Sequence, residues 1–495
     1  MRNRGSSLYL RIVTLFFSSI AIILTVITLV QYSRLRSNYP PRMVIAGVPV
    51  GGLDPQAAAQ RLLQVYSLPV EIHYGEAIIQ LEPNLVSFHL DIESMLVAAD
   101  IQRTGASFWG GFWDYLWNRQ SATSEVPLIT TYSEERLRAY LKGEIAARYD
   151  QPPIPAQPIP GSTEFQPGQP GQTIDIDRAV ILIEDAMRSP SQRVVLLAPL
   201  RTAPGRPSKQ NLQLLLQGII AQNGFDGIVG MYLRDLQSAE ELHFAYRAGE
   251  NLPVNPDIAF TASSTIKIPI MVAAFRHFDG RLDAQTANLT LDMIKKSENP
   301  PSDALMKVID EVRGPLVVSE TMEALGLENT FLAGYFYEGA PVLKVFRTPA
   351  NQRTDISTDP DFYSQTTTSD MGALLEDIYQ CAQTGGGTLV AAFPAQIDQI
   401  SCQQMVEYLK EDKIGVLIQA GVPEGTAVAH KHGWVTDPGG VIHNVSDAAI
   451  VYTPSGNYIL VIYVYHPTQI VWDQVSKMYA DLSRAIYNYF NLAAR

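Results

Sequence analysis

The sequence has very little cysteine, only Cys381 and Cys402 among 495 residues. Two cysteines cannot build a structural zinc site of the cysteine-rich kind, and the sequence predicts neither a metal nor another cofactor. The two flank a segment between two expected helices, at residues 371–383 and 401–412. In an oxidising exterior a disulfide here would stabilise the fold by about 3 kcal/mol. Two buried free thiols are an equal alternative.

The chain also lacks an excess of basic residues. It has 37 Lys and Arg against 50 Asp and Glu, a net charge of −13. This balance argues against a nucleic-acid partner, which favours a basic face. The 46% hydrophobic and 18% charged residues are typical of a globular protein, and the length predicts two to three domains.

Long charge-free apolar runs are absent except for residues 12–30. At about 1.5 Å per residue this run just crosses a hydrocarbon core of about 30 Å. A cleavable signal peptide has a shorter apolar region and a small-residue cleavage site. We therefore predict an uncleaved transmembrane signal anchor, with a cytoplasmic tail at 1–11 and a juxtamembrane linker at 31–42. Arginines on both sides leave the orientation open.

After the linker, short apolar runs alternate with helical patterns, which is typical of an α+β domain. Asp54 is the expected N-cap of a helix at 55–66. The phrases IAGVPVGGLDPQAAAQRL and DIESMLVAADIQRTG resemble the peptidoglycan-binding domain of vancomycin-resistance W-type proteins. The resemblance implies a wall-associated α+β domain over 43–200. The Pro-rich stretch 151–161 is expected to lie inside it, and a linker is expected at 201–207.

Within this domain Trp109, Trp113 and Trp117 recur at every fourth residue and form one stripe of a helix. Such a stripe would suit stacking on sugars or contact with the membrane interface. The alternative, which we favour, is an aromatic face that packs on the domain.

Three short patches in the C-terminal part of the chain carry candidate chemistry. The first is Ser264-Thr265-Ile266-Lys267, at the polar start of an apolar helix. Residues three apart share one helix face, so the lysine is able to take the proton of the serine hydroxyl. Taken alone, Ser264 would be a helix cap and Lys267 a surface lysine.

The second and third patches supply the other groups of an acyl-transfer site. Ser297 and Asn299 lie in a turn between two helices and offer a proton relay and an amide for the substrate, or else a capping turn. Lys431 offers a positive charge to a substrate carboxylate, or is a surface lysine. The backbone N–H of Trp434 would join that of Ser264 as an oxyanion hole, because Gly433 allows close approach.

From 208 to 495, strands at both ends and a helical middle predict one antiparallel sheet covered by helices. With the phrases FTASSTIKIPIM, MIKKSENP and VAHKHGW, the ordered trio resembles the S-x-x-K, S-D-N and K-T-G elements of class A β-lactamase-related serine hydrolases. This resemblance implies an acylated Ser264 with Lys267 as base and Ser297 as proton relay. Asn299 would position the substrate, and Lys431, His432, Gly433 and Trp434 would bind its carboxylate side.

The sequence departs from that family at several places. Glu298 stands for Asp, His432 stands for Thr or Ser, and the Glu and Asn pair that holds the deacylating water is missing; Glu338 and Asp355 are candidates only by default. The short interval between Ser264 and Ser297 predicts a trimmed helical subdomain and an open cleft. His430 and His432 share one side of a strand, but no third metal ligand is evident.

The leading hypothesis is a serine hydrolase anchored in the cytoplasmic membrane, with the chain beyond about residue 31 outside the cytoplasm. It would form an acyl-enzyme with peptidoglycan peptides or β-lactams and turn β-lactams over slowly. The rival hypothesis is a non-catalytic peptidoglycan-binding or sensing protein that kept the fold and lost the chemistry. A nucleophile and its base are the minimum for acyl transfer, and both are present.

Overall fold

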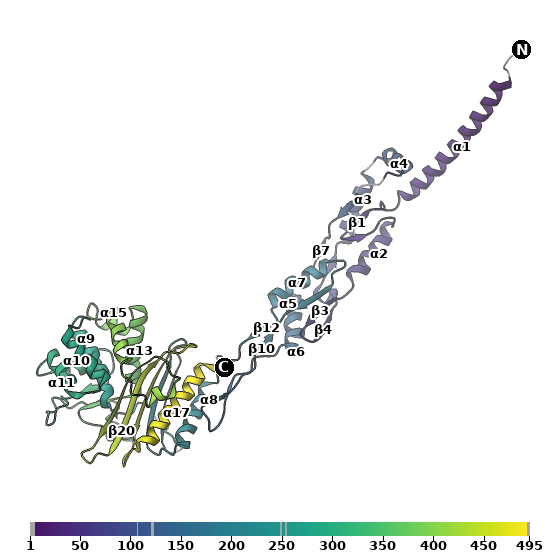
Figure 1. Ribbon diagram of the computed structural model, residues 1–495. Helices are drawn as coiled ribbons and strands as arrows, with labels where there is room; N and C mark the ends of the chain where they lie inside the picture. Colours follow the sequence, from purple (N-terminus) through teal and green to yellow (C-terminus); the bar gives the residue numbers. More distant parts are fainter. Residues whose placement is uncertain (1–4, 106, 120–122, 248–249, 253–254, 493–495) are drawn as a thin grey trace. The chain divides into compact units, whose positions relative to one another are not determined.

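The computed structural model describes residues 5–105, 107–119, 123–247, 250–252 and 255–492. The chain divides into two compact units, each built of helices and strands (Figure 1). The first comprises Met1–Ile154 and Gln169–Pro204, and the second comprises Pro155–Gly168 and Gly205–Arg495. The mixed α+β class predicted from the sequence is confirmed.

The first unit begins with helix α1, Gly5–Leu35. Its segment Tyr9–Leu35 is long and apolar enough to cross a membrane, and none of its most apolar stretch is buried. The expected helix at 55–66 is α2, and the Asp54 carboxylate caps it by accepting a hydrogen bond from the Ala57 amide at 2.7 Å.

Two three-stranded sheets organise the rest of this unit, in the orders β2-β1-β6 and β11-β3-β4. The core lies between these sheets and helices α2, α3, α5 and α7. The elements after α1 are β1 Met43–Ile45, β2 Val48–Pro49, α2 Pro55–Tyr66, β3 Val70–Tyr74, β4 Ala77–Leu81, η1 Pro83–Val86, β5 His89–Leu90, α3 Ile92–Thr104, α4 Phe108–Leu116, β6 Ser124–Val126, β7 Thr130–Thr131, α5 Glu134–Tyr140, η2 Leu141–Ala146, α6 Ala147–Tyr149, β10 Gly171–Thr173, α7 Ile176–Arg188, β11 Val194–Leu197 and β12 Leu200–Thr202.

The second unit is built on a six-stranded antiparallel sheet in the order β15-β14-β13-β21-β20-β19. Strands from both ends of the unit meet in its centre, where β13 pairs with β21 from Ile228↔Tyr465 to Asp235↔Tyr458. The predicted antiparallel sheet assembled from distant segments is therefore confirmed, although the unit also contains two smaller sheets, in the orders β16-β18-β17 and β8-β9.

The elements of the second unit are β8 Gln157–Pro158, β9 Phe165–Gln166, α8 Lys209–Gln222, β13 Ile228–Asp235, β14 Glu241–Arg247, β15 Glu250–Asn251, β16 Phe260–Thr261, η3 Ser263–Ile266, α9 Lys267–His277, α10 Ala284–Lys295, α11 Asn299–Ile309, α12 Gly314–Ala324, β17 Phe331–Leu332, β18 Ser364–Thr366, α13 Thr368–Thr384, α14 Thr388–Ala392, α15 Gln399–Leu409, α16 Ile418–Gly421, β19 Val428–Thr436, β20 Ile442–Val451, β21 Tyr458–Tyr465 and α17 Trp472–Phe490.

Helices cover both faces of this sheet (Figure 1). Side chains alternate along a strand, so in β13 Val229 and Met231 point to one core and Ile228 and Tyr232 to the other. Helices α8 and α17 cover the sheet face to which Val229 and Met231 point. The helical layer that includes α9, α13 and α15 covers the opposite face, and the turn that carries Ser264 lies in this layer.

The Pro-rich stretch departs from its expected place inside the first domain. Residues 155–168 pack with the second unit, where the Phe165 ring lies 6.2 Å from the Tyr489 ring. The Asn488 side-chain amide donates to the Thr163 carbonyl oxygen at 2.8 Å. Contacts with α17 thus accompany the assignment of residues 155–168 to the second unit, which their composition did not indicate.

The cysteine alternatives are resolved in favour of the disulfide. Cys381 in α13 and Cys402 in α15 are bonded, with their Cα atoms 5.8 Å apart. The bond joins two helices that pack beside each other in the helical layer.

Candidate active site

The first patch forms a sharp entry into a buried helix. Strand β16 leads into the short helix η3, and α9 begins at Lys267. Ser263 has φ 53°, a left-handed conformation that is uncommon outside glycine. Left-handed backbone at non-glycine residues is found at functional sites. The next residue, Ser264, is half-buried just before the start of α9.

Lys267 joins the first patch to the second. Its ammonium group donates to the Ser264 hydroxyl oxygen at 2.8 Å, the Ser297 carbonyl oxygen at 2.7 Å and the Asn299 amide oxygen at 3.1 Å. The Ser297 hydroxyl lies 3.5 Å away. Four predicted site residues thus meet at one nitrogen.

The surroundings of Lys267 favour its neutral form. Burial lowers the pKa of Lys267 to about 7, and the positive charge of Lys431 acts in the same direction. The carboxylates of Asp412 and Asp303 oppose the shift without cancelling it. Near neutral pH a large fraction of the amine is therefore unprotonated and able to accept the Ser264 proton at the same 2.8 Å separation.

The second patch is a turn between α10 and α11. Ser297 has φ 59°, again left-handed, and Asn299 is the first residue of α11. Because the Asn299 amide oxygen faces Lys267, its Nδ2 group remains available, with no protein acceptor among the described residues. An exposed amide donor beside the serine is what a site for an acyl amide requires.

The third patch lies in β19, against the nucleophile. A Cβ added at Gly433 would lie 2.5 Å from the Ser264 backbone nitrogen and 2.9 Å from the Ser263 Cβ. Only glycine fits there, so β19 passes the Ser264 amide more closely than a side chain would allow. The next residue, Trp434, is 40% exposed, and its ring stacks on His432 with the centroids 5.2 Å apart.

Lys431 and His432 are held by a residue that the sequence analysis missed, Asp412. One oxygen of its buried carboxylate accepts from Lys431 Nζ at 3.0 Å, His432 Nδ1 at 2.7 Å and the His432 amide at 3.2 Å. Burial alone would raise the pKa of Asp412, but the hydrogen bond from His432 and the charge of Lys431 bring it down to about 2. No spacing rule links residues 412 and 431, so no sequence signal pointed to this group.

Lys431 itself is fully buried. The structure does not bring its ammonium group into hydrogen-bond contact with Ser264, Lys267 or Ser297 within the described ranges. Along β19, Lys431 points to the same face as Ala429, which packs in the core on the helical-layer side, and the positive charge of Lys431 acts on Lys267, whose pKa it helps to lower.

The side chains of His430 and His432 are buried and hydrogen-bond to neighbouring groups inside the second unit. His430 is completely buried between the Asp447 carboxylate at 2.9 Å and the Asp412 carbonyl oxygen at 2.6 Å. Burial opposes a charge on His430, but Asp447 outweighs it and raises the pKa of His430. Among the described residues, no group of three or more His, Cys, Asp and Glu side chains is arranged to hold a metal ion.

The two default candidates for activating a deacylating water lie elsewhere. Glu338 is exposed, and Asp355 is paired with the Arg353 guanidinium at 2.7 Å. In the part of the chain that the structure describes, neither carboxylate hydrogen-bonds to Ser264 or Lys267. Asn351 ties its loop to strand β18 by donating to Gln365 Oε1 at 2.9 Å.

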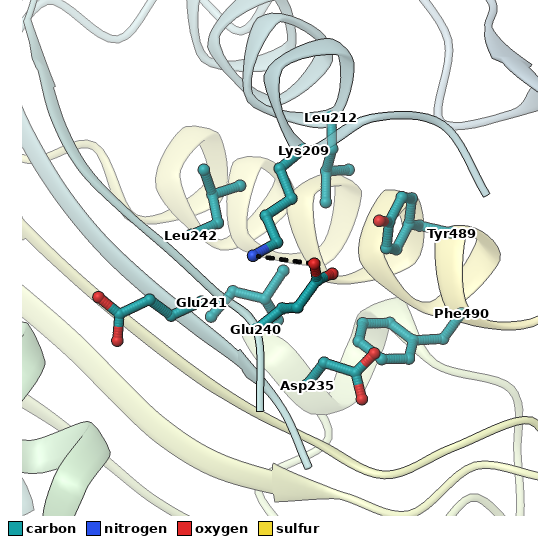
Figure 2. Close-up of a pocket in the computed structure, with 9 residues that line it drawn as sticks. Lys209, Leu212, Asp235, Glu240, Glu241, Leu242, Tyr489 and Phe490 are labelled. Atoms are coloured by element: carbon teal, nitrogen blue, oxygen red, sulfur yellow. Dashed lines mark ion pairs between the residues drawn. The ribbon is translucent and has the colours of Figure 1, made fainter. Parts of the chain in front are cut away.

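A separate hollow lies in the second unit between helices α8 and α17 and strands β13 and β14 (Figure 2). Its cavity volume is about 20 Å³, room for about one water molecule. The Lys209 ammonium points toward Glu240 at 3.7 Å and partly neutralises the acidic lining. This hollow is too small for a substrate.

Comparison with known families decides where this unit belongs. The model of the Beta-lactamase enzyme family matches residues 211–290 and 284–490, which is more than half of the chain. The chain belongs to the β-lactamase enzyme family. The matched region contains all three patches and all six strands of the large sheet. The β-lactamase-like fold predicted from the sequence is thereby confirmed.

Three solved structures illustrate the likeness of this β-lactamase-family chain to known proteins. A point mutant of PBP-A, in an acyl-enzyme complex with penicillin-G, is 21% identical and covers 57% of this chain and 97% of its own, with a TM-score of 0.40. A β-lactamase from Sphaerobacter thermophilus is 18% identical (58% and 98% covered, TM-score 0.42). An ancestral class A β-lactamase is 21% identical (55% and 98%, TM-score 0.39). No curated protein matches the sequence.

Proposed function

We propose that this β-lactamase-family chain is a serine hydrolase that forms an acyl-enzyme through Ser264 with peptidoglycan peptides or β-lactams. The observation that carries the proposal is the set of contacts at Lys267 Nζ, which reach Ser264, Ser297 and Asn299. A nucleophile touching a buried amine of lowered pKa is the minimum arrangement for serine acyl transfer.

The acylation step follows from these positions. The neutral amine of Lys267 takes the Ser264 proton while the serine oxygen attacks the carbonyl carbon of the substrate. The backbone N–H groups of Ser264 and Trp434 stabilise the negative oxygen. The carbon–nitrogen bond then breaks, and the leaving nitrogen receives the proton from Lys267 through the Ser297 hydroxyl. Asn299 orients the substrate amide.

Binding of the substrate carboxylate falls to the β19 side of the cleft. Because the Lys431 ammonium is buried on Asp412, it contributes a positive field to this side of the site. Hydrolysis of the acyl-enzyme needs a water molecule that adds hydroxide to the acyl carbon and returns a proton to Ser264. Since the sequence lacks the Glu and Asn pair that the resemblance leads one to expect for holding this water, we infer slow β-lactam turnover.

The remaining parts of the proposal rest on the N-terminal unit. Residues 12–30 would anchor the chain in the cytoplasmic membrane with its bulk outside, and residues 43–200 would associate with peptidoglycan as in W-type vancomycin-resistance proteins. The apolar, unburied helix α1 supports the first point, and the sequence resemblance supports the second. The domain limits proposed are an anchor at 12–30, a wall-associating domain at 43–200 without residues 155–168, which pack with the second unit, and a hydrolase domain at 208–495.

The test is covalent labelling of the purified full-length protein with a fluorescent penicillin. Ser264→Ala should abolish labelling, whereas Ser191→Ala, which changes an exposed serine of the other unit, should leave it intact. Labelling that persists in Ser264→Ala would refute the assignment, and a wild-type protein that takes no label would favour the non-catalytic rival. A time course of nitrocefin hydrolysis separates a stalled acyl-enzyme from fast turnover.

A further inference from the structure

Helix α4 exposes an aromatic face that the domain does not use. Trp109, Trp113 and Trp117 are 62%, 57% and 70% exposed, so the expectation that this stripe packs on the domain is wrong. Phe112, on another face of the helix, is buried instead. Contiguous exposed aromatic surface of this size marks an interaction site in a soluble domain.

The buried face of α4 packs on the end of α1. The Tyr32 ring lies 5.4 Å from Phe108, 5.6 Å from Phe112 and 5.5 Å from Tyr115, between ring centroids. Gly111 has no side chain, and the Tyr32 hydroxyl occupies the place where a Cβ would stand, so a larger residue here would displace the Tyr32 ring. Figure 1 shows α4 beside the C-terminal end of α1.

The connection between α1 and the domain is fixed by hydrogen bonds. The Arg103 guanidinium donates to the Arg36 carbonyl oxygen at 2.6 Å, and the Tyr39 amide donates to the Leu53 carbonyl oxygen at 2.8 Å. The Arg36 guanidinium lies over the Phe108 ring, 5.2 Å from its centroid. These contacts hold α4 at one level along the axis of α1.

Along the axis of α1, this position coincides with the end of the apolar segment 12–30. Tyr32 follows residue 30 by two positions, about 3 Å along a helix axis. If α1 spans a bilayer with residues 12–30, the Tyr32 contacts place α4 at the headgroup layer. Tryptophan is enriched at this layer because its indole is apolar and still carries an N–H donor.

We propose that α4 lies in the headgroup layer of the outer leaflet, with Trp109, Trp113 and Trp117 inserted among the phospholipids. The inference rests on the proposed membrane anchoring and adds a second contact that holds the first unit at the bilayer. The charges fit this position, because Asp114, the acidic residue of α4, is paired with Arg119 at 3.7 Å. An amphipathic helix of this kind lies in the plane of the interface.

The experiment uses the full-length protein in vesicles of phosphatidylcholine and phosphatidylglycerol, with or without brominated acyl chains, which quench tryptophan on contact. The sequence has five tryptophans, and Trp434 and Trp472 pack against each other in the second unit. We expect brominated lipid to remove about half of the wild-type fluorescence. The triple variant W109F/W113F/W117F, which keeps bulky rings and so keeps the fold, should show no quenching.

Each outcome decides a separate point. Protein that floats with the vesicles but is not quenched would overturn the placement of α4 and leave the anchor standing. Protein that stays in the aqueous fraction would overturn the anchor and this inference with it. Quenching that persists in the triple variant would overturn the assignment to these three residues. If the tryptophans are not quenched, two further measurements identify what the aromatic face binds. A shift of their emission on addition of soluble peptidoglycan fragments would assign the face to sugars. A wild type that is a dimer, with a W109S/W113S/W117S variant that is a monomer, would assign it to a second copy of the chain.

Discussion

The Asp412 carboxylate lies 3.0 Å from the Lys431 ammonium, and both groups are buried in the second unit. The same carboxylate oxygen accepts from His432, so one residue between α15 and β19 holds two residues of the third patch. Lys431 and His432 therefore owe their positions to a carboxylate outside the strand that carries them.

Asp412→Asn should destabilise the second unit by about 3 to 5 kcal/mol, because it leaves the buried charge of Lys431 without its partner. The pKa of the folded-state carboxylate is depressed from 3.8 to about 2, so its contribution is complete above 3.8 and is lost as the pH falls toward 2. Urea unfolding of both proteins across this range measures the difference.

The matched control is Glu407→Gln, which removes a surface carboxylate paired with Lys410 at 2.7 Å and should cost no more than about 1 kcal/mol. Equal losses in the two variants would show that Asp412 has no special role.

The rate of acylation should rise with pH around the pKa of Lys267, about 7. Only the neutral amine accepts the Ser264 proton, so the slow form is the one below this pKa and the fast form the one above it. Single-turnover labelling with penicillin over the range from about pH 5 to 9 records the profile. A rate that does not vary over this range would exclude Lys267 as the base.

Gly433→Ala should reduce acylation by about 100-fold or more while the protein stays folded, because the new Cβ displaces the Ser264 amide that forms one side of the oxyanion hole. The rate of penicillin labelling and the thermal midpoint together measure this. Gly218→Ala in α8 adds a methyl group where nothing lies within 4 Å, and its labelling rate should equal that of the wild type. A Gly433→Ala protein that is acylated at the normal rate would contradict the placement of β19.

The disulfide between Cys381 and Cys402 should stabilise the unit by about 3 kcal/mol through the loop it closes. Replacing both cysteines with alanine lowers the free energy of unfolding by that amount. Reductant should have the same effect on the wild type and none on the double variant. If reductant leaves the wild-type unfolding curve unchanged, the bond makes no such contribution.

Local patterns were sufficient to predict the second unit and the pairing of Ser264 with Lys267. Their three-residue spacing is a property of one helix turn, and the strands at both ends of the unit are long and strongly apolar. The start of α2 follows from its cap, Asp54.

The features that the sequence did not predict depend on contacts between distant segments. Asp412 contacts Lys431 where the segment after α15 meets β19, and Phe165 in the segment 155–168 contacts Tyr489 on α17. The tryptophan stripe was visible in the sequence, but Tyr32, far earlier in the chain, determines which face of α4 is buried. The periodicity of a sequence shows which residues share one face of a helix, but it does not show which segment of the chain that face packs against.

The most direct test of the central claim is mass spectrometry of the intact protein after incubation with benzylpenicillin. We predict a mass increase of one whole penicillin molecule, since opening the lactam ring releases no fragment, and a modified peptide that contains Ser264. The adduct should persist after free penicillin is removed, because the sequence lacks the Glu and Asn pair expected to hold a deacylating water. An unmodified protein, or an adduct on a peptide without Ser264, would contradict the account.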